Sequence, residues 1–182
     1  MNKFPIKITG TSVEEKLQKG VFIFIYRASK IPPHIGLIAN GKLYDITSVG
    51  PSIDIAVADF HKTAVKRKTE VLFVELKPSK IENLTEIITE KVKKHYKVTL
   101  ETSCLTPVKA FIQEAYQIEV LQTHFIFELL PVLFQHHLIA NVWELNLAHK
   151  IKNQTFEMKK YTKQDVENCV AALHRKEQLS CE

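Results

Sequence analysis

The sequence predicts an α+β fold in which an antiparallel sheet of four to six strands packs against an amphipathic helix. The β-branched and aromatic run "VFIFIYR", residues 21–27, is typical of a buried strand. Two short apolar runs flank Asn40-Gly41, a dipeptide that favours a tight hairpin because both positions tolerate a positive φ. In "TPVKAFIQEAYQ", residues 106–117, apolar residues recur at helical spacing and indicate the helix.

The other elements of the first half follow in order along the chain. Strands are expected at 34–39 and 42–47, the two arms of the hairpin, and at 70–76. The segment after Gly50 is expected to begin as a loop and then to form a short helix over 58–65. "PSKIENLTEIITEKVKKHY" is predicted to be helical because four apolar residues share one face: Ile81, Leu84, Ile88 and Val92.

The last sixty residues give a weaker pattern. "THFIFELLPVLFQHHLIA" predicts either a kinked helix or two short elements, because Pro131 interrupts helical hydrogen bonding. "VWELNLA" alternates with the period of a strand, and "YTKQDVENCVAALHRK" predicts a helix with Thr162 as its N-cap. We expect a single domain, 1–182, in which residues 118–182 form a mixed C-terminal extension.

Composition places the chain among ordinary globular proteins. Its 182 residues are 45% hydrophobic and 25% charged, and the formal net charge is +5. The basic residues are scattered and no aromatic pattern interleaves with them, so a nucleic-acid partner is not expected. The N-terminus lacks the apolar region of a signal peptide. We therefore expect a cytoplasmic protein.

The longest apolar stretch is "FIFELLPVLF", residues 125–134. It is about half as long as a membrane span requires, and it contains Glu128 and Pro131. No transmembrane segment is therefore expected. The stretch is interpreted as part of the core or as a surface through which copies of the chain associate into a homo-oligomer.

The cysteines and histidines give no sign of a disulfide framework or a metal site. Cys104, Cys169 and Cys181 are odd in number and widely spaced, and no CxxC occurs. Cys169 is expected in the core, on the apolar side of its helix, and Cys181 is expected to be an uninvolved, exposed thiol. His124 and the adjacent pair His136-His137 have no partner at metal-ligand spacing, so no metal is expected.

Cys104 is the candidate nucleophile because an extended segment gives way there to the amphipathic helix. The first N–H groups and the dipole of a helix favour a thiolate and can stabilise an oxyanion. His34 and Asp45 lie on the two arms of the hairpin, and folding back at Asn40-Gly41 brings them together. The three residues could then act as nucleophile, base and orienting carboxylate.

These segments resemble a known superfamily. "VFIFIYRASKIPPHIGLIANGKLYDI" resembles the strand, loop and hairpin of NlpC-type cysteine peptidases, and "SCLTPVKAFIQEAY" is similar to their nucleophile helix. Here His34 precedes Cys104, an order that resembles the circularly permuted branch of the papain-like fold, which includes the lecithin:retinol acyltransferase-like proteins. The resemblance covers residues 20–117, a permuted papain-like core.

The chain departs from that family in three places. Leu105 follows the cysteine where the family often has a small residue, and the third polar position is Asp45 where cell-wall enzymes commonly have histidine. Thr106-Pro107 is itself a good N-cap and N1 pair, and a helix starting there would leave Cys104 outside the helix.

The resemblance implies a cysteine hydrolase or acyltransferase that acts on an amide or ester bond in a peptide or acyl substrate. Neither a metal nor an organic cofactor is needed for that chemistry. The alternative is a non-catalytic binding or structural module that keeps the papain-like fold.

Overall fold

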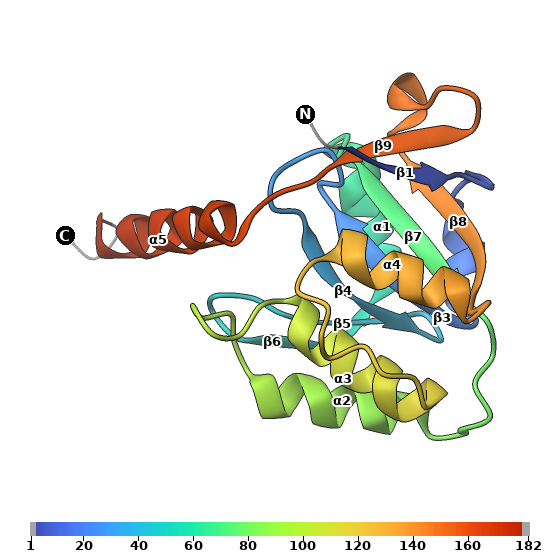
Figure 1. The fold of residues 1–182 in the computed structure, drawn as a ribbon, viewed down its shortest axis with the longest axis horizontal. Helices are drawn as coiled ribbons and strands as arrows, with labels where there is room; N and C mark the ends of the chain where they lie inside the picture. The colour runs from blue at the N-terminus through green and yellow to red at the C-terminus, as the bar shows by residue number, and fades with distance from the viewer. Residues whose placement is uncertain (1–2, 180–182) are drawn as a thin grey trace.

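The computed structural model describes residues 3–179, which form a mixed α+β fold (Figure 1). Within this range there are a seven-stranded sheet and a two-stranded sheet. In spatial order, the strands of the large sheet are β2 (Gly10–Thr11), β8 (Ile139–Leu145), β7 (Val71–Leu76), β3 (Val21–Tyr26), β4 (His34–Ala39), β5 (Lys42–Ile46) and β6 (Pro51–Ala56). The small sheet pairs β1 (Lys3–Lys7) with β9 (Thr155–Lys159). Neighbouring strands are antiparallel except β2 and β8.

Five α-helices and two short 3-10 helices occur within residues 3–179. They are η1 (Glu14–Gln18), α1 (Val57–Lys66), α2 (Leu84–His95), α3 (Leu105–Tyr116), α4 (Ile126–Gln135), η2 (Ala148–Lys150) and α5 (Lys163–Leu179). In Figure 1, α2 and α3 lie together beside β4 and β5, α4 crosses in front of the sheet, and α5 projects away from the body. None of these helices combines the length and the apolar character needed to cross a bilayer.

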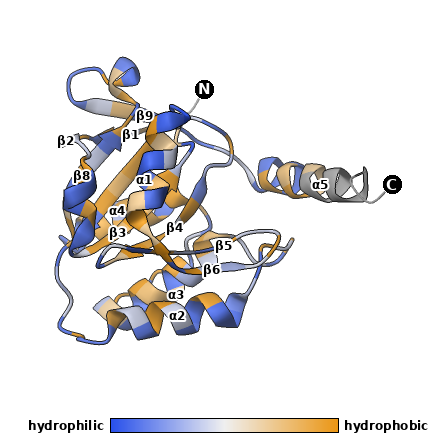
Figure 2. Cartoon of the chain, turned by 180° about the vertical axis from the view of Figure 1, so that it is seen from behind, coloured by the Kyte–Doolittle hydropathy of each residue, from blue (hydrophilic) through white to orange (hydrophobic). Residues whose placement is uncertain are grey.

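The sheet centre is buried on both faces, which explains the unbroken apolar run of β3. Successive side chains of a strand point to opposite faces. Ile23 and Ile25 pack with residues of α2, α3 and α4, whereas Phe22 and Phe24 pack with residues of α1 and η1. Full burial of each such side chain contributes about 1.5–3 kcal/mol. Figure 2 shows the central strands as largely hydrophobic.

The hairpin forms where the sequence predicts it. Asn40 and Gly41 both have a positive φ, 48° and 78°, as the tight turn between β4 and β5 requires. On β4, the missing side chain of Gly36 leaves space for the ring of Phe24 and the carbonyl oxygen of Tyr44. A Cβ built there would lie 2.5 Å from the ring of Phe24 and 2.7 Å from the carbonyl oxygen of Tyr44.

The sheet is wider than the expected four to six strands, because β6 and the short β2 join it. The segment after Gly50 was expected to begin as a loop, but residues 51–56 form the edge strand β6. None of its residues is fully buried, and the pairing with β5 shifts register between Leu43 and Asp45. An exposed, irregular edge strand lacks the alternation that marks a strand in the sequence.

Residues 118–179 contribute strands to both sheets. Strand β8 lies between β2 and β7 inside the large sheet, and β9 pairs with β1 near the N-terminus. Because β8 is an interior strand, residues 20–117 do not contain the complete sheet.

The apolar stretch 125–134 is largely a single helix, α4, with Pro131 inside it. The carboxylate of Glu128 accepts hydrogen bonds from the N–H groups of His124 (2.7 Å) and Phe125 (3.2 Å), which caps the helix. One face is fully buried: Ile126, Leu129, Leu130 and Leu133. The stretch is therefore used mainly in the core of its own chain, which is the first of the two roles expected for it.

Replacing Gly36 with alanine should destabilise the hairpin that carries the candidate site. The added methyl group overlaps the Phe24 ring and a backbone oxygen that cannot rotate away, so we expect the free energy of unfolding to fall by about 1–3 kcal/mol. Denaturant unfolding measures this change. The matched control is Gly10→Ala, whose Cβ meets only the edge of the Trp143 ring at 3.3 Å. Equal stability of the two variants would contradict this account of Gly36.

Candidate active site

His34 is the first residue of β4, and its side chain has a fixed environment on two sides. It pairs with Tyr26 on β3, and its ring lies 5.9 Å from the ring of Phe24, centroid to centroid. Its Nε2 is 2.7 Å from Oδ2 of Asp45. With Nε2 held in this way, Nδ1 is the ring nitrogen left for another partner.

Asp45 reaches His34 because of the hairpin register. Leu37 pairs with Tyr44, so Asp45 lies one step further along β5 and diagonal to His34. Asp45 is only 7% exposed, and its Oδ1 has no hydrogen-bond partner within residues 3–179. A buried carboxylate is costly unless it is paired, so the His34 ring is its main compensating partner.

Cys104 occupies the N-cap position of α3, because the helix begins at Leu105. The N–H of Ser103 donates to Oγ1 of Thr106 (3.1 Å), and the N–H of Thr106 donates to the carbonyl oxygen of Ser103 (3.0 Å). These bonds close a turn around Cys104 before Thr106. The sequence pair Thr106-Pro107 does not start the helix, since Pro107 fits equally well within the first turn, where N–H groups need no helical acceptor.

This start places Cys104 where the positive end of the helix dipole acts. The N–H groups of Cys104 and Leu105 have no hydrogen-bond acceptor within residues 3–179. Both are therefore free to donate to an oxygen atom brought next to the cysteine.

The charge of His34 is set by its two neighbours. Burial of the ring would lower its pKa, but the hydrogen bond to Asp45 and the proximity of Cys104 raise the pKa from 6.5 to about 10. The ring is therefore protonated at neutral pH. An imidazolium next to a cysteine stabilises the thiolate, the nucleophilic form of sulfur.

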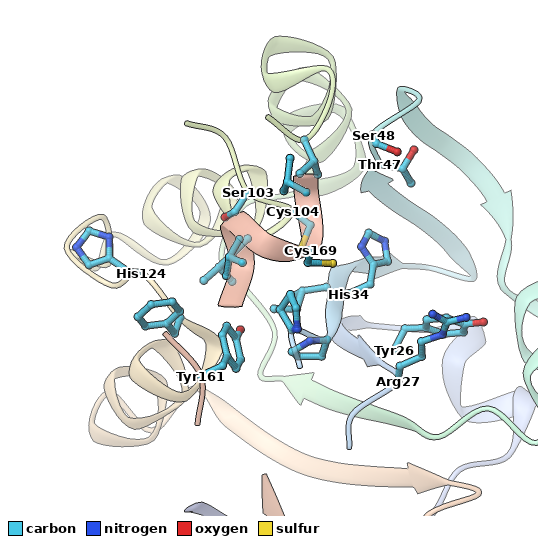
Figure 3. A pocket seen from close by; sticks show the side chains of 18 residues that line it. Tyr26, Arg27, His34, Thr47, Ser48, Ser103, Cys104, His124, Tyr161 and Cys169 are labelled. Atoms are coloured by element: carbon cyan, nitrogen blue, oxygen red, sulfur yellow. The ribbon is translucent and has the colours of Figure 1, made fainter. Parts of the chain in front are cut away.

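His34 and Cys104 both line a cavity of about 360 Å³ (Figure 3). Most of its walls are apolar, from Pro32 and Pro33 before β4 to Val98, Leu105 and Phe125. The remaining lining residues are Tyr26, Arg27, Ile35, Thr47, Ser48, Ser103, His124, Tyr161, Val166, Cys169 and Val170. Hairpin, helix start and C-terminal region therefore meet in one pocket.

Tyr161 also lines this pocket, although no pattern in the sequence marks it as a site residue. The residue is 7% exposed, and its ring makes edge-to-face contacts with Phe125 and Phe127, both at 5.2 Å. Burial, followed by the negative charge of Cys104, raises the pKa of Tyr161, so the hydroxyl stays protonated. In Figure 3 that hydroxyl is drawn on the pocket side of the ring. Its place depends on how the segment after β9 folds back, which no local pattern reveals.

Cys169 was expected in the core, but it lines the pocket and is only partly buried. Helical periodicity correctly put it on one side of α5 with Val166 and Val170, which line the same pocket. That side faces the cavity because α5 covers the pocket with its first turns. Cys181 lies outside the described residues.

The cavity holds one further histidine, His124, on a separate wall. Within residues 3–179, no three His, Cys, Asp or Glu side chains gather as a metal site. No protein-family model, curated protein or solved structure matches this chain. What the site can do is therefore inferred from its geometry.

The raised pKa of His34 should make the stability of the chain depend on pH. The folded chain holds the ring proton up to about pH 10, whereas the unfolded chain releases it near 6.5. This contribution is therefore complete below pH 6.5 and is lost as the pH rises toward 10, by at most about 1.4 kcal/mol per pH unit.

Denaturant unfolding at a series of pH values measures the effect. The reference is the double variant His34→Gln with Asp45→Asn, which removes both charges and leaves neither one buried alone. The wild-type advantage in the free energy of unfolding should shrink steadily with rising pH. A constant difference would show that the ring is not protonated in the folded chain.

Proposed function

We propose that this chain is a cysteine hydrolase or acyltransferase with the permuted papain-like arrangement. In this proposal Cys104 is the nucleophile, His34 is the acid and base, and Asp45 orients His34. One observation carries it: a protonated His34, bonded to a buried Asp45, lines the same pocket as Cys104 at a helix start. The three residues come from separate elements, and a thiol, an imidazole and a carboxylate in this order are what covalent catalysis requires.

The chemistry follows from the resting charges. The Cys104 thiolate attacks the carbonyl carbon of an ester or amide, and the His34 imidazolium then gives its proton to the leaving alcohol or amine. The product is a thioester on Cys104. Water or an acceptor alcohol or amine, deprotonated by His34, attacks this thioester and frees the sulfur. Water makes the protein a hydrolase, and another acceptor makes it an acyltransferase.

Stabilisation of the oxyanion falls to the start of α3. The unpaired N–H groups of Cys104 and Leu105 are the nearest fixed donors, and each such donor typically contributes about 10²–10³ in rate. Leu105 stands where related enzymes often have a small residue. It is 2% exposed and forms part of the pocket wall.

The lining supports a substrate with an apolar group next to the reacting carbonyl. Residues such as Val98, Phe125 and Val170 offer no hydrogen bonds to a sugar or a charged group. Arg27 is the one lining side chain within residues 3–179 that carries a permanent positive charge. An acyl chain or an apolar peptide side chain fits this lining better than a polar group.

The arrangement of elements supports the permuted papain-like class. The hairpin β4–β5 carries the base and the carboxylate, and the cysteine opens the helix that packs against β4. The histidine precedes the cysteine in the chain, as in the permuted branch.

Thiol reactivity tests the proposed nucleophile. At mildly acidic pH, iodoacetamide should modify Cys104 faster than Cys169 or Cys181, because the imidazolium of His34 favours the thiolate of Cys104. His34→Ala should slow this labelling by about 10²–10⁴-fold, since it removes the neighbouring positive charge. Asp45→Asn, which keeps the shape of the side chain, should slow it less. Peptide mass spectrometry follows each site.

Turnover is tested with a panel of p-nitrophenyl esters. Wild type should release p-nitrophenol with a burst as the thioester accumulates, and Cys104→Ser should not. Apolar acyl groups such as octanoyl should be preferred to acetyl. Equal and slow labelling of all three cysteines, together with no turnover of any ester, would instead favour a binding or structural module that keeps the fold.

A further inference from the structure

The candidate nucleophile has a second thiol in its pocket. Cys104 and Cys169 both line the cavity, and both are free and partly buried. Figure 3 draws the two sulfur atoms (yellow) in the centre of the pocket, on the side where the His34 ring lies. Cys104 is the N-cap of α3, whereas Cys169 lies in the second turn of α5.

Helix α5 carries Cys169 into the lining of the pocket. Its start is fixed by a capping box: the N–H of Thr162 donates to Oδ2 of Asp165 (2.8 Å), and the N–H of Asp165 donates to Oγ1 of Thr162 (3.3 Å). Val166 packs against the main core, and Val170 is 5% exposed. Beyond these turns the helix projects away from the body (Figure 1). Few apolar contacts therefore hold α5 over the pocket.

We propose that Cys104 and Cys169 form a reversible disulfide that closes the site under oxidising conditions. The bond would fix α5 over the cavity and occupy the sulfur needed for covalent catalysis. Its formation needs only the two thiols and an oxidant. The loss of turnover that it would cause rests on the proposed function.

The chemistry balances with a peroxide as the oxidant. The Cys104 thiolate attacks one oxygen of hydrogen peroxide, the O–O bond breaks, and Cys104 becomes a sulfenic acid while the other oxygen leaves as water after taking a proton. The sulfur of Cys169 then attacks the Cys104 sulfur, and the S–O bond breaks. The leaving hydroxide takes the proton of the Cys169 thiol and departs as a second water. Two thiols are oxidised, one peroxide is reduced, and a dithiol reverses the change.

The position of His34 decides which cysteine reacts first. Thiolates, not thiols, react with peroxide, and the imidazolium lies beside Cys104. Cys169 then acts as the resolving thiol. It protects Cys104, because a disulfide can be reduced whereas a sulfinic acid generally cannot.

The test exposes the full chain to hydrogen peroxide, blocks free thiols, and maps peptides without reduction. Wild type should give a cross-linked Cys104–Cys169 peptide that disappears after treatment with dithiothreitol. Cys181→Ser is the matched control and should give the same cross-link. Cys169→Ser should give none. With dimedone present, the Cys104 sulfenic acid of this variant should be trapped as the adduct, and without dimedone it should advance to sulfinic acid at least several-fold faster than in wild type.

A second measurement separates this inference from the proposed function. Ester turnover after peroxide treatment should be recovered by dithiothreitol several-fold better in wild type than in Cys169→Ser. Ester turnover in a chain that forms no Cys104–Cys169 cross-link would overturn the proposed disulfide and would still support the proposed enzyme. A reversible cross-link in a chain that never turns over esters supports the disulfide and counts against the enzyme. Cross-linking of Cys104 to Cys181, or sulfinic acid forming equally fast with and without Cys169, also overturns the proposal.

Discussion

The buried carboxylate of Asp45 is the constraint on which the candidate site depends. One oxygen is 2.7 Å from Nε2 of His34, and the other has no partner in the part of the chain that the structure describes, so this carboxylate is compensated mainly by one neighbouring ring. An uncompensated charge in such a place costs several kcal/mol. Protonation of the His34 ring offsets this cost, and the positive charge of the same ring also interacts with Cys104. A residue on β5 thus sets the charge of the ring that lies beside Cys104.

The scaffold fixes this geometry through regular elements. Strands and helices hold side chains more exactly than loops do. His34 and Asp45 are joined by a two-residue turn and one register, so their relative position is local to the hairpin. Cys104 is placed by the helix that packs on the same sheet. The close approach of Phe24 to Gly36 lets β4 lie tightly against β3, two residues from His34.

Features determined by short-range chemistry could be predicted from the sequence, and features determined by long-range packing could not. The hairpin, its two polar residues and most helices follow from turn chemistry and periodicity. The start of α3 could not be predicted, because Thr106 can play two roles. As an N-cap it would leave Cys104 outside the helix. Its hydrogen bonds with Ser103 instead make Cys104 the N-cap. The positions of β8, Tyr161 and Cys169 depend on where distant segments pack, and a single sequence carries no record of that.

The place of β8 inside the large sheet has a consequence for how the protein is made. All three proposed catalytic residues are translated early, but the strand beside β7 and the aromatic wall of the pocket leave the ribosome much later. Until then one edge of β7 has no neighbour, and unpaired strand edges tend to associate with other chains. The nascent polypeptide therefore carries Cys104 before it carries the residues that complete the pocket around this thiol. During synthesis the thiol is thus exposed for longer than in the folded chain.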